Sequence, residues 1–496
     1  MSKLNKDILF LIFEELQDDS KSLFSCLMVN KHWCETVIPI LWKNPWNYNI
    51  NYRNKSYLFA IITFYLSDDI KEFLTRQEIQ LHSISSKSLF FDYLSFCRSI
   101  NVNIINALIS TGTSLAYNQF LLQQEFYSLF MKKCPELKYL DMKSIKHQIF
   151  YFPEANSRLE SLFELECDTS IDSLFFYGLA RFCRYIQRII IVNVDPNPNH
   201  HGIVKLIEVQ KNLRYFEWID DFDYEKECFT DDFYKEIFLE LKNKADTLNH
   251  FKLFYNDDEV YGREILQEIL QVLHKLKTLI INDLGTISEY LLKTLIYNDL
   301  EILNINYITI NEASIIIENS GGQLKVVLSK PYYRLYNDDF DEGSLMFIRK
   351  VYENCPLIEV LSLAFSSSKK HFAEFEILLN VCQNLKSLLL IIRSTDIIET
   401  GEKILENGEE LLKVLIRAAP KNLRELRFFN NFKFSLEALD EFLGKWKGCA
   451  LSILTSDIIY EEENYKKLIN KYKNKGVIKS FRCESFMNVE DMNFKI

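Results

Sequence analysis

A short apolar pattern recurs along most of this chain of 496 residues. The pattern is L-x-x-L-x-L, with other apolar residues allowed at the leucine positions, and nine of the twelve intervals between its occurrences are 24 to 28 residues long. A period of this length constrains the fold to repeating units that stack on one another. The thirteen occurrences begin at Leu137, Leu162, Ile186, Leu213, Leu248, Leu276, Leu300, Leu324, Ile358, Leu385, Leu423, Leu451 and Ile478.

The motif and its period resemble those of leucine-rich repeats. That resemblance implies an α/β fold, a curved solenoid with parallel strands on the concave side and helices on the convex side. The segments between the motifs agree, because 120–133, 262–274 and 372–382 carry apolar residues at helical spacing. Several of these segments end at a cysteine just before the next motif, as at Cys134 and Cys355.

A repeat array of this kind offers a binding face. Within the motif the leucines point into the core, and the residues flanking the second and third leucine point out from the concave sheet. Mixed charges with aromatic side chains at those positions suit a protein partner. The predicted target-binding residues are Tyr139, Asp141, Arg188, Tyr215, Glu217, His250, Lys252, Phe254, Arg427 and Phe429.

The first 42 residues follow a different pattern. Apolar residues at helical spacing predict three short helices, with Ser20 as a cap of the second and Pro39 marking a break or turn in the third. The run from Ile8 to Phe13 is apolar on every side. Three such helices bury too little surface to be secure alone, so another surface must cover their second face.

These residues resemble an F-box. The resemblance rests on Leu4-x-x-Asp7-Ile8-Leu9-x-x-Ile12-Phe13-x-x-Leu16, then Ser22-Leu23-x-x-Cys26-x-x-Val29-Asn30-x-x-Trp33, then Leu41-Trp42. F-box motifs dock onto a Skp-type adaptor, which connects them to a cullin–RING ubiquitin ligase. One departure is Asn5, which stands where the family usually has proline. The adaptor-binding residues that the resemblance implies are Leu4, Ile8, Leu9, Ile12, Phe13, Leu16, Leu23, Val29 and Trp33.

The resemblance divides the chain into three parts. Residues 1–45 would form the F-box, 46–118 a helical linker or degenerate capping repeat, and 119–496 the leucine-rich-repeat solenoid. In the middle part, 89–100 predicts a helix running into a short strand at 100–102. This segment, together with Leu41-Trp42-Lys43-Asn44-Pro45-Trp46, resembles lineage-expanded fungal families of F-box proteins with leucine-rich repeats.

No pattern of catalytic chemistry is present in the sequence. There is no glycine-rich phosphate loop, and no cluster of cysteine and histidine has the spacing of a zinc site. The net charge of −11, from 58 basic and 69 acidic residues, disfavours a nucleic-acid partner. We therefore expect a non-catalytic protein without metal or cofactor, located in the cytoplasm or nucleus, with no membrane association.

The expected function is that of a substrate receptor in a Skp–cullin–F-box ubiquitin ligase. Its F-box would hold the adaptor and its repeats would hold a target protein. Two other interpretations remain open from the sequence. One is a repeat scaffold that works without a ligase, and the other is a small-molecule co-receptor, although Ile280, Ile302, Leu389 and Ile391 make the centre of the sheet poorly suited to a polar ligand.

Overall fold

The computed structural model divides the chain into two compact units, an N-terminal unit, Met1–Lys244, and a C-terminal unit, Ala245–Ile496. The structure describes residues 5–47, 52–81, 88–194, 201–222, 234–255, 263–282, 289–306, 308–330, 340–393, 400–429, 433–485 and 489.

The N-terminal unit begins with three helices, α1 (Lys6–Glu15), α2 (Ser20–Leu27) and α3 (Lys31–Lys43). Each has a polar residue at its N-cap whose side chain accepts a backbone N–H of the first turn, and these residues are Asn5, Asp19 and Asn30. The prediction that Ser20 caps the second helix was therefore wrong by one residue. The predicted break at Pro39 was also wrong, because α3 runs through it.

A connecting region follows these helices. It contains η1 (Pro45–Asn47), α4 (Tyr52–Phe64), α5 (Asp68–Arg76), α6 (Tyr93–Phe96), β1 (Ser99–Asn101) and α7 (Val102–Ile109). The helix predicted over 89–100 shrinks to α6, because Cys97 is already extended and the chain enters β1 two residues later. Trp46 fixes this point by donating its indole N–H to the carbonyl of Ser99 over 3.0 Å.

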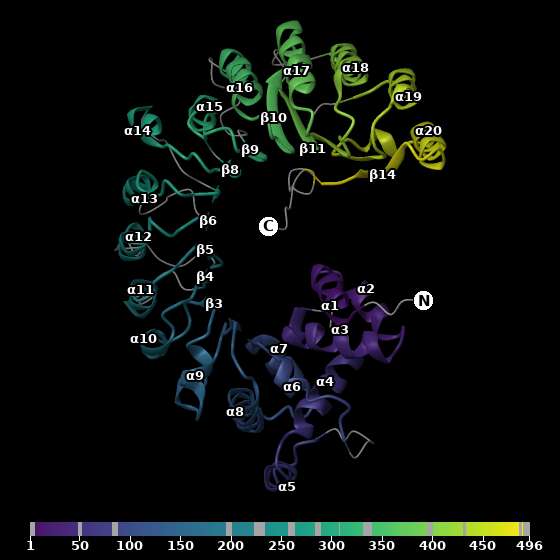
Figure 1. Ribbon diagram of the computed structural model, residues 1–496. Helices are drawn as coiled ribbons and strands as arrows, with labels where there is room; N and C mark the ends of the chain where they lie inside the picture. The colour runs from purple at the N-terminus through teal and green to yellow at the C-terminus, as the bar shows by residue number, and fades with distance from the viewer. Residues whose placement is uncertain are drawn as a thin grey trace. The chain divides into compact units, whose positions relative to one another are not determined.

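The rest of the N-terminal unit alternates strands and helices. Strands β1 to β5 pair in sequence order and in parallel. The helices cover one face of this sheet (Figure 1). The other face, which these helices do not cover, is called the inner face. These elements are α8 (Ala116–Lys133), β2 (Tyr139–Asp141), η2 (Ile149–Tyr151), α9 (Ala155–Leu159), β3 (Glu164–Asp168), α10 (Ser173–Phe182), β4 (Arg188–Asn193), α11 (His201–Glu208), β5 (Tyr215–Asp220) and α12 (Tyr234–Lys242).

The C-terminal unit repeats the same arrangement from β6 to β14, again in parallel and in sequence order. Its strands are β6 (His250–Phe254), β7 (Thr278–Ile281), β8 (Ile302–Asn306), β9 (Val326–Lys330), β10 (Val360–Ser366), β11 (Ser387–Arg393), β12 (Glu425–Phe429), β13 (Leu451–Thr455) and β14 (Ile478–Cys483). Its helices are α13 (Arg263–Leu270), α14 (Glu289–Thr294), α15 (Ile310–Glu318), α16 (Phe340–Asn354), α17 (Lys369–Val381), α18 (Gly401–Ala418), α19 (Leu436–Lys445), η4 (Ile458–Glu461) and α20 (Glu463–Asn474).

The core of each repeat lies between its strand and its helices. All thirteen predicted motifs coincide with a strand, and their leucines, such as Leu165, Leu303 and Leu426, are fully buried on the helix side of the sheet. The cysteines that follow helices are buried there too, as Cys134 and Cys382 show. The described residues thus form α/β repeats in which parallel strands alternate with helices, which confirms the predicted repeating architecture and is consistent with leucine-rich repeats.

Candidate protein-binding surfaces

Helix α1 has three faces with different surroundings. Leu9 and Phe13 are each only 1% exposed and form the buried face of α1. The ring of Phe13 meets Trp33 of α3 edge-on, with the ring centroids 5.2 Å apart. Leu23 of α2 is also completely buried. The three helices thus already have a small core of their own.

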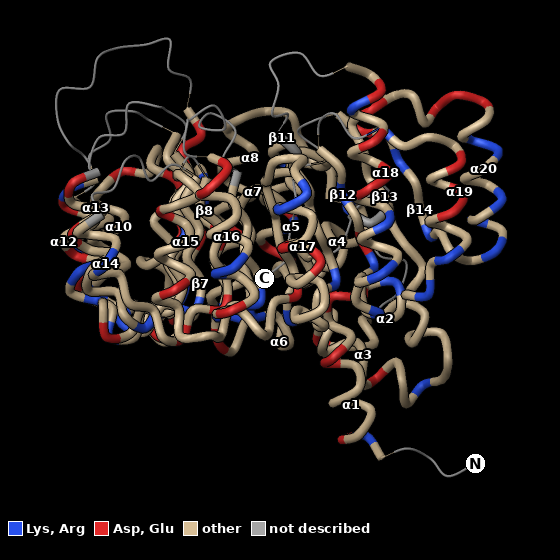
Figure 2. The backbone as a smooth tube through the Cα atoms, turned by 90° about the horizontal axis from the view of Figure 1, so that it is seen from above, with Lys and Arg blue, Asp and Glu red and all other residues tan. Residues whose placement is uncertain are grey.

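The second face of α1 is apolar and exposed. Leu11 is 62% exposed and Ile12 45%, and Ile8 is exposed to a similar degree. Apolar side chains of α2 and of the turn after it are exposed as well, namely Phe24, Met28 and Val29. The charged residues of α1, coloured in Figure 2, are Lys6, Asp7, Glu14 and Glu15 near the two ends of the helix, and the stretch from Ile8 to Phe13 between them carries no charge. A set of exposed apolar side chains with few charges is typical of a protein-binding surface.

The nine predicted adaptor-binding residues therefore separate into groups. Leu9, Phe13 and Leu23 belong to the core of the three helices, and Leu16 and Trp33 are half-buried. Ile8, Ile12 and Val29 are exposed, and Leu4 lies outside the described residues. Sequence reasoning missed Leu11, Phe24 and Met28, although the all-round apolar run from Ile8 to Phe13 was a signal for the first of them.

The third face of α1 borders a hollow of about 470 Å³ within the N-terminal unit. The rest of its lining comes from α3, α6, the start of β2 and the residues just before β2 and β3. It is lined by Phe10, Glu14, Gln17, Pro39, Ile40, Lys43, Phe96, Arg98, Glu136, Lys138, Tyr139 and Phe163. Since Phe10, Glu14 and Gln17 recur at helical spacing, this face of α1 is distinct from the one that carries Ile8 and Ile12.

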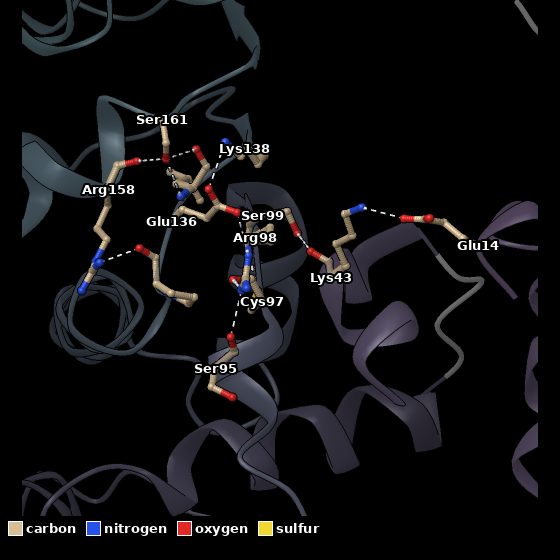
Figure 3. Close-up of polar contacts among 12 residues, drawn as sticks. Glu14, Lys43, Ser95, Cys97, Arg98, Ser99, Glu136, Lys138, Arg158 and Ser161 are labelled. Atoms are coloured by element: carbon tan, nitrogen blue, oxygen red, sulfur yellow. Dashed lines mark hydrogen bonds and ion pairs between the residues drawn. The ribbon is translucent and has the colours of Figure 1, made fainter. Parts of the chain in front are cut away.

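Charged residues form part of this lining, and Figure 3 shows how they pair. Lys43 lies 3.6 Å from the carboxylate of Glu14. Glu136 receives Arg98 at 3.2 Å on one oxygen and Lys138 at 3.0 Å on the other. The hydrogen bond from Lys138, followed by the charges of both cations, lowers the pKa of Glu136. Three cations thus face two carboxylates.

Arg98 is held in a fixed position. Its Nη1 donates to the carbonyls of Ser95 and Cys97, over 2.8 and 2.9 Å (Figure 3). Its backbone N–H donates to the carbonyl of Lys43, which ties α3 to the start of β1. The hollow is therefore built on a polar frame that joins the helices to the first repeats.

The inner face of the N-terminal unit is acidic. Asp141, Glu164 and Glu166 border a small pocket of about 120 Å³ that also includes Asn101 and Tyr139. Burial raises the pKa of Asp141, with repulsion from Glu166 adding to it, and burial likewise raises that of Glu164. Lys143 partly offsets this negative charge, because its Nζ lies 2.6 Å from the carboxylate of Glu166.

The predicted target-binding residues on β4 and β5 are mutually paired. The guanidinium of Arg188 stacks over the ring of Tyr215, 3.8 Å from its centroid, and its Nε lies 3.5 Å from Glu164. Tyr215 is buried by this packing and donates its hydroxyl to Glu217. Tyr139, Asp141, Arg188 and Glu217 keep part of their surface exposed.

The inner face of the C-terminal unit carries the other five predicted residues. His250 hydrogen-bonds Thr278 over 2.9 Å, and Lys252 and Phe254 are partly exposed beside it. Arg427 lies 2.8 Å from Glu425 and donates to the carbonyl of Val489 over 3.2 Å. Phe429 is buried, as are Leu389 and Ile391 on the neighbouring strand. Leu389 and Ile391 thus add apolar side chains to this part of the inner face, as the sequence predicted, while Arg427 lies beside Leu389 on the next strand.

Within the described ranges, no group of histidine, cysteine and acidic side chains is arranged to hold a metal ion. The same part of the chain contains no helix long and apolar enough to cross a membrane.

Comparisons with known proteins add one similarity of fold. A scan against protein-family models found no match, and a search of curated proteins found none either. Among solved structures, the chain is similar to the leucine-rich repeat-containing protein LegL7 from Legionella pneumophila. The sequence identity is 12%, the TM-score is 0.33, and the match covers 68% of this chain and 98% of that one.

Proposed function

We propose that this protein is the substrate-recognition subunit of a ubiquitin ligase of the Skp–cullin–F-box type. In this proposal α1 to α3 dock a Skp-type adaptor, and the repeats bind the target protein. The chain itself performs no chemistry and needs no cofactor. It acts by proximity, because holding a target beside a ubiquitin-charged enzyme raises the effective concentration of the reacting groups.

The observation that carries the proposal is the exposed apolar face of α1. Its helices already possess a filled core around Leu9 and Phe13, so Ile8, Leu11 and Ile12 are not needed to complete it. Leaving such side chains in water has a cost that a partner would remove, at about 25 cal/mol for each Å² of apolar surface covered. The F-box resemblance supplies the identity of the partner, and the repeat fold supports a role in protein recognition.

The helix caps bear on the departure at Asn5. The side chain of Asn5 accepts the backbone N–H of Asp7, and asparagine is among the preferred N-cap residues. The start of α1 is therefore defined by a cap in place of the proline that the family usually has. Asn5 is no argument for the rival proposal, a repeat scaffold that works without a ligase.

The test is co-purification with a Skp-type adaptor. The double variant Leu11→Asp/Ile12→Asp places two charges on the exposed face of α1 and leaves the core residues Leu9 and Phe13 untouched. Burying two unpaired charges costs several kcal/mol, so adaptor binding should fall more than about a hundredfold. The matched control is Leu174→Asp on α10, a side chain 67% exposed in the repeats, which should bind the adaptor like the wild type.

The outcomes separate the candidates. Adaptor binding by the wild type and the control, with loss in the double variant, supports the ligase receptor. A wild-type protein that binds no adaptor contradicts the proposal and leaves a repeat scaffold. Equal binding by the double variant places the interface elsewhere and removes the observation on which the proposal rests.

A further inference from the structure

The hollow beside α1 has a lining that the adaptor proposal does not use. Phe10 and Phe163 are both 39% exposed and come from different elements of the lining, one on α1 and one just before β3. Pro39, Ile40 and Phe96 complete an apolar floor. With about 470 Å³, the hollow has the size of sites that hold a small ligand or a few side chains of a bound peptide.

The charges around this floor favour an anionic partner. Lys43, Arg98 and Lys138 outnumber Glu14 and Glu136 by one, although the whole chain has a net charge of −11. The guanidinium of Arg98 already hydrogen-bonds Glu136 and two backbone carbonyls. Lys43 is more accessible to a ligand, because its side chain is 43% exposed and its contact with Glu14 is as long as 3.6 Å. A carboxylate arriving beside the floor would therefore be met first by Lys43.

The position of Tyr139 connects the hollow with the repeats. Tyr139 borders the hollow and also the acidic pocket on the inner face of β2 and β3. A chain segment seated in the hollow can thus continue over Tyr139 onto the predicted target-binding face. This continuity favours a segment of a bound protein over a free small molecule.

We propose that the hollow binds a short segment of the target protein in which an aromatic side chain stands next to an aspartate or glutamate. The aromatic ring fills the floor between Phe10 and Phe163, and the carboxylate pairs with Lys43. Aromatic rings supply large apolar area at low entropic cost, and a charge pair beside them fixes orientation. The inference rests on the proposed function only in naming the segment's source as a target.

The test is selection from a displayed library of random 12-residue peptides on the immobilised full-length protein. The wild type should enrich peptides with an aromatic residue next to Asp or Glu. Phe163→Asp should lose this enrichment, and Lys43→Glu should shift it toward peptides with Lys or Arg in place of the acid. An enriched peptide, labelled with fluorescein, should bind Phe163→Asp at least about tenfold more weakly in fluorescence polarisation.

Controls make the result specific. Leu11→Asp lies on another face of α1 and should enrich the same peptides as the wild type. All variants are compared by circular dichroism and thermal melting, and Lys43→Glu changes a partly exposed residue that no core packing requires. The shift of charge preference in Lys43→Glu is a readout that simple loss of folding would not produce.

Two results would overturn the inference. One is a wild-type selection without an aromatic–acid consensus, and the other is the same consensus on Phe163→Asp and Lys43→Glu. Adaptor co-purification by these two variants should remain at the wild-type level. Failure of the adaptor test with success here would contradict the ligase proposal alone, whereas the reverse pattern would contradict only this site.

Discussion

The side-chain amide of Asn193 donates a hydrogen bond of 3.0 Å to the carboxylate of Asp220, across the end of two neighbouring strands. Both side chains are buried. Asn193 also accepts from Thr169 on the other side over 2.9 Å. Asp220 further accepts from the indole of Trp218 and from the hydroxyl of Tyr234. A buried series of hydrogen bonds thus links three successive repeats of the N-terminal unit.

Replacing Asn193 by Ala should destabilise the N-terminal unit by about 1–3 kcal/mol, because Thr169 loses an acceptor and Asp220 loses one of its donors inside the protein. The measurement is urea unfolding followed by tryptophan fluorescence, and four of the five tryptophans belong to this unit. Thr169→Val should cost a similar amount, because the hydroxyl of Thr169 donates to Asn193 and also accepts the backbone N–H of Val194 over 3.0 Å. An Asn193→Ala protein as stable as the wild type would show that this chain of hydrogen bonds contributes no net stability.

The second prediction concerns the loss of stability at acidic pH. His371 is 2% exposed, and its ring nitrogens lie 2.8 Å from the hydroxyls of Ser344 and Ser368. Burial lowers the pKa of His371 below its usual 6.5, and the nearby carbonyl and charge of Asp341 only partly offset this. The unfolded chain therefore binds a proton first as the pH falls. The stability from neutral His371 is complete above pH 6.5 and is lost as the pH falls below it.

His147 adds to the same effect, since burial between Phe120 and Tyr127 lowers its pKa too. Thermal melts between pH 7.5 and 5 should show a falling melting temperature that starts near pH 6.5. His371→Gln keeps the hydrogen bonding and should flatten the decline, even if it is less stable at pH 7.5. A variant with the wild-type slope would mean that His371 is not the titrating group.

The third prediction compares two glycines. A Cβ on Gly202 of α11 would lie 2.4 Å from the carbonyl oxygen of Ser173, which belongs to the backbone of α10 and cannot move aside. Gly202→Ala should therefore push the two helices apart and cost about 1–3 kcal/mol. Gly401 begins α18 and has nothing within 4 Å of the same position. Gly401→Ala should be neutral or stabilising by up to about 1 kcal/mol.

Thermal unfolding of both glycine variants checks this contrast. Equal melting temperatures for Gly202→Ala and Gly401→Ala would contradict the close approach of α10 and α11. A loss in Gly401→Ala would instead indicate that the start of α18 depends on the glycine itself.

The repeat fold could be predicted because its signal is periodic. Each L-x-x-L-x-L motif alternates buried and outward residues, and this alternation identifies a strand without knowledge of its neighbours. The buried hydrogen bonds around Asn193 and Asp220 could not be predicted in this way. The two residues lie 27 residues apart, and polar residues at a strand end are usually part of a turn.

Pro39 illustrates a second limit. Proline usually ends a helix because it removes a hydrogen bond and crowds the preceding turn, yet α3 continues to Lys43. The residues after it, Ile40 to Trp42, are buried, so tertiary packing outweighs the local cost. The hollow that Pro39 helps to line joins residues from 10 to 163 and has no local pattern in the sequence.

The candidate adaptor face was only partly predictable for a related reason. In a helix that is apolar all round, periodicity does not reveal which side is covered by its own domain. Leu9 and Leu11 both lie within the same apolar stretch of the sequence. The packing of α3 against α1 nevertheless buries Leu9 and leaves Leu11 in solvent. The position of Trp33 against Phe13 decides which face becomes the core.

This difference gives the last prediction. Leu9→Ala removes buried methyl groups and should destabilise the three helices by about 2–5 kcal/mol. Leu11→Ala should change stability by less than about 0.5 kcal/mol, because its side chain is 62% exposed. Limited proteolysis near the N-terminus would measure the two effects. Equal loss of protection in both variants would mean that Leu11 belongs to the core, and the apolar face of α1 would no longer be available for a partner.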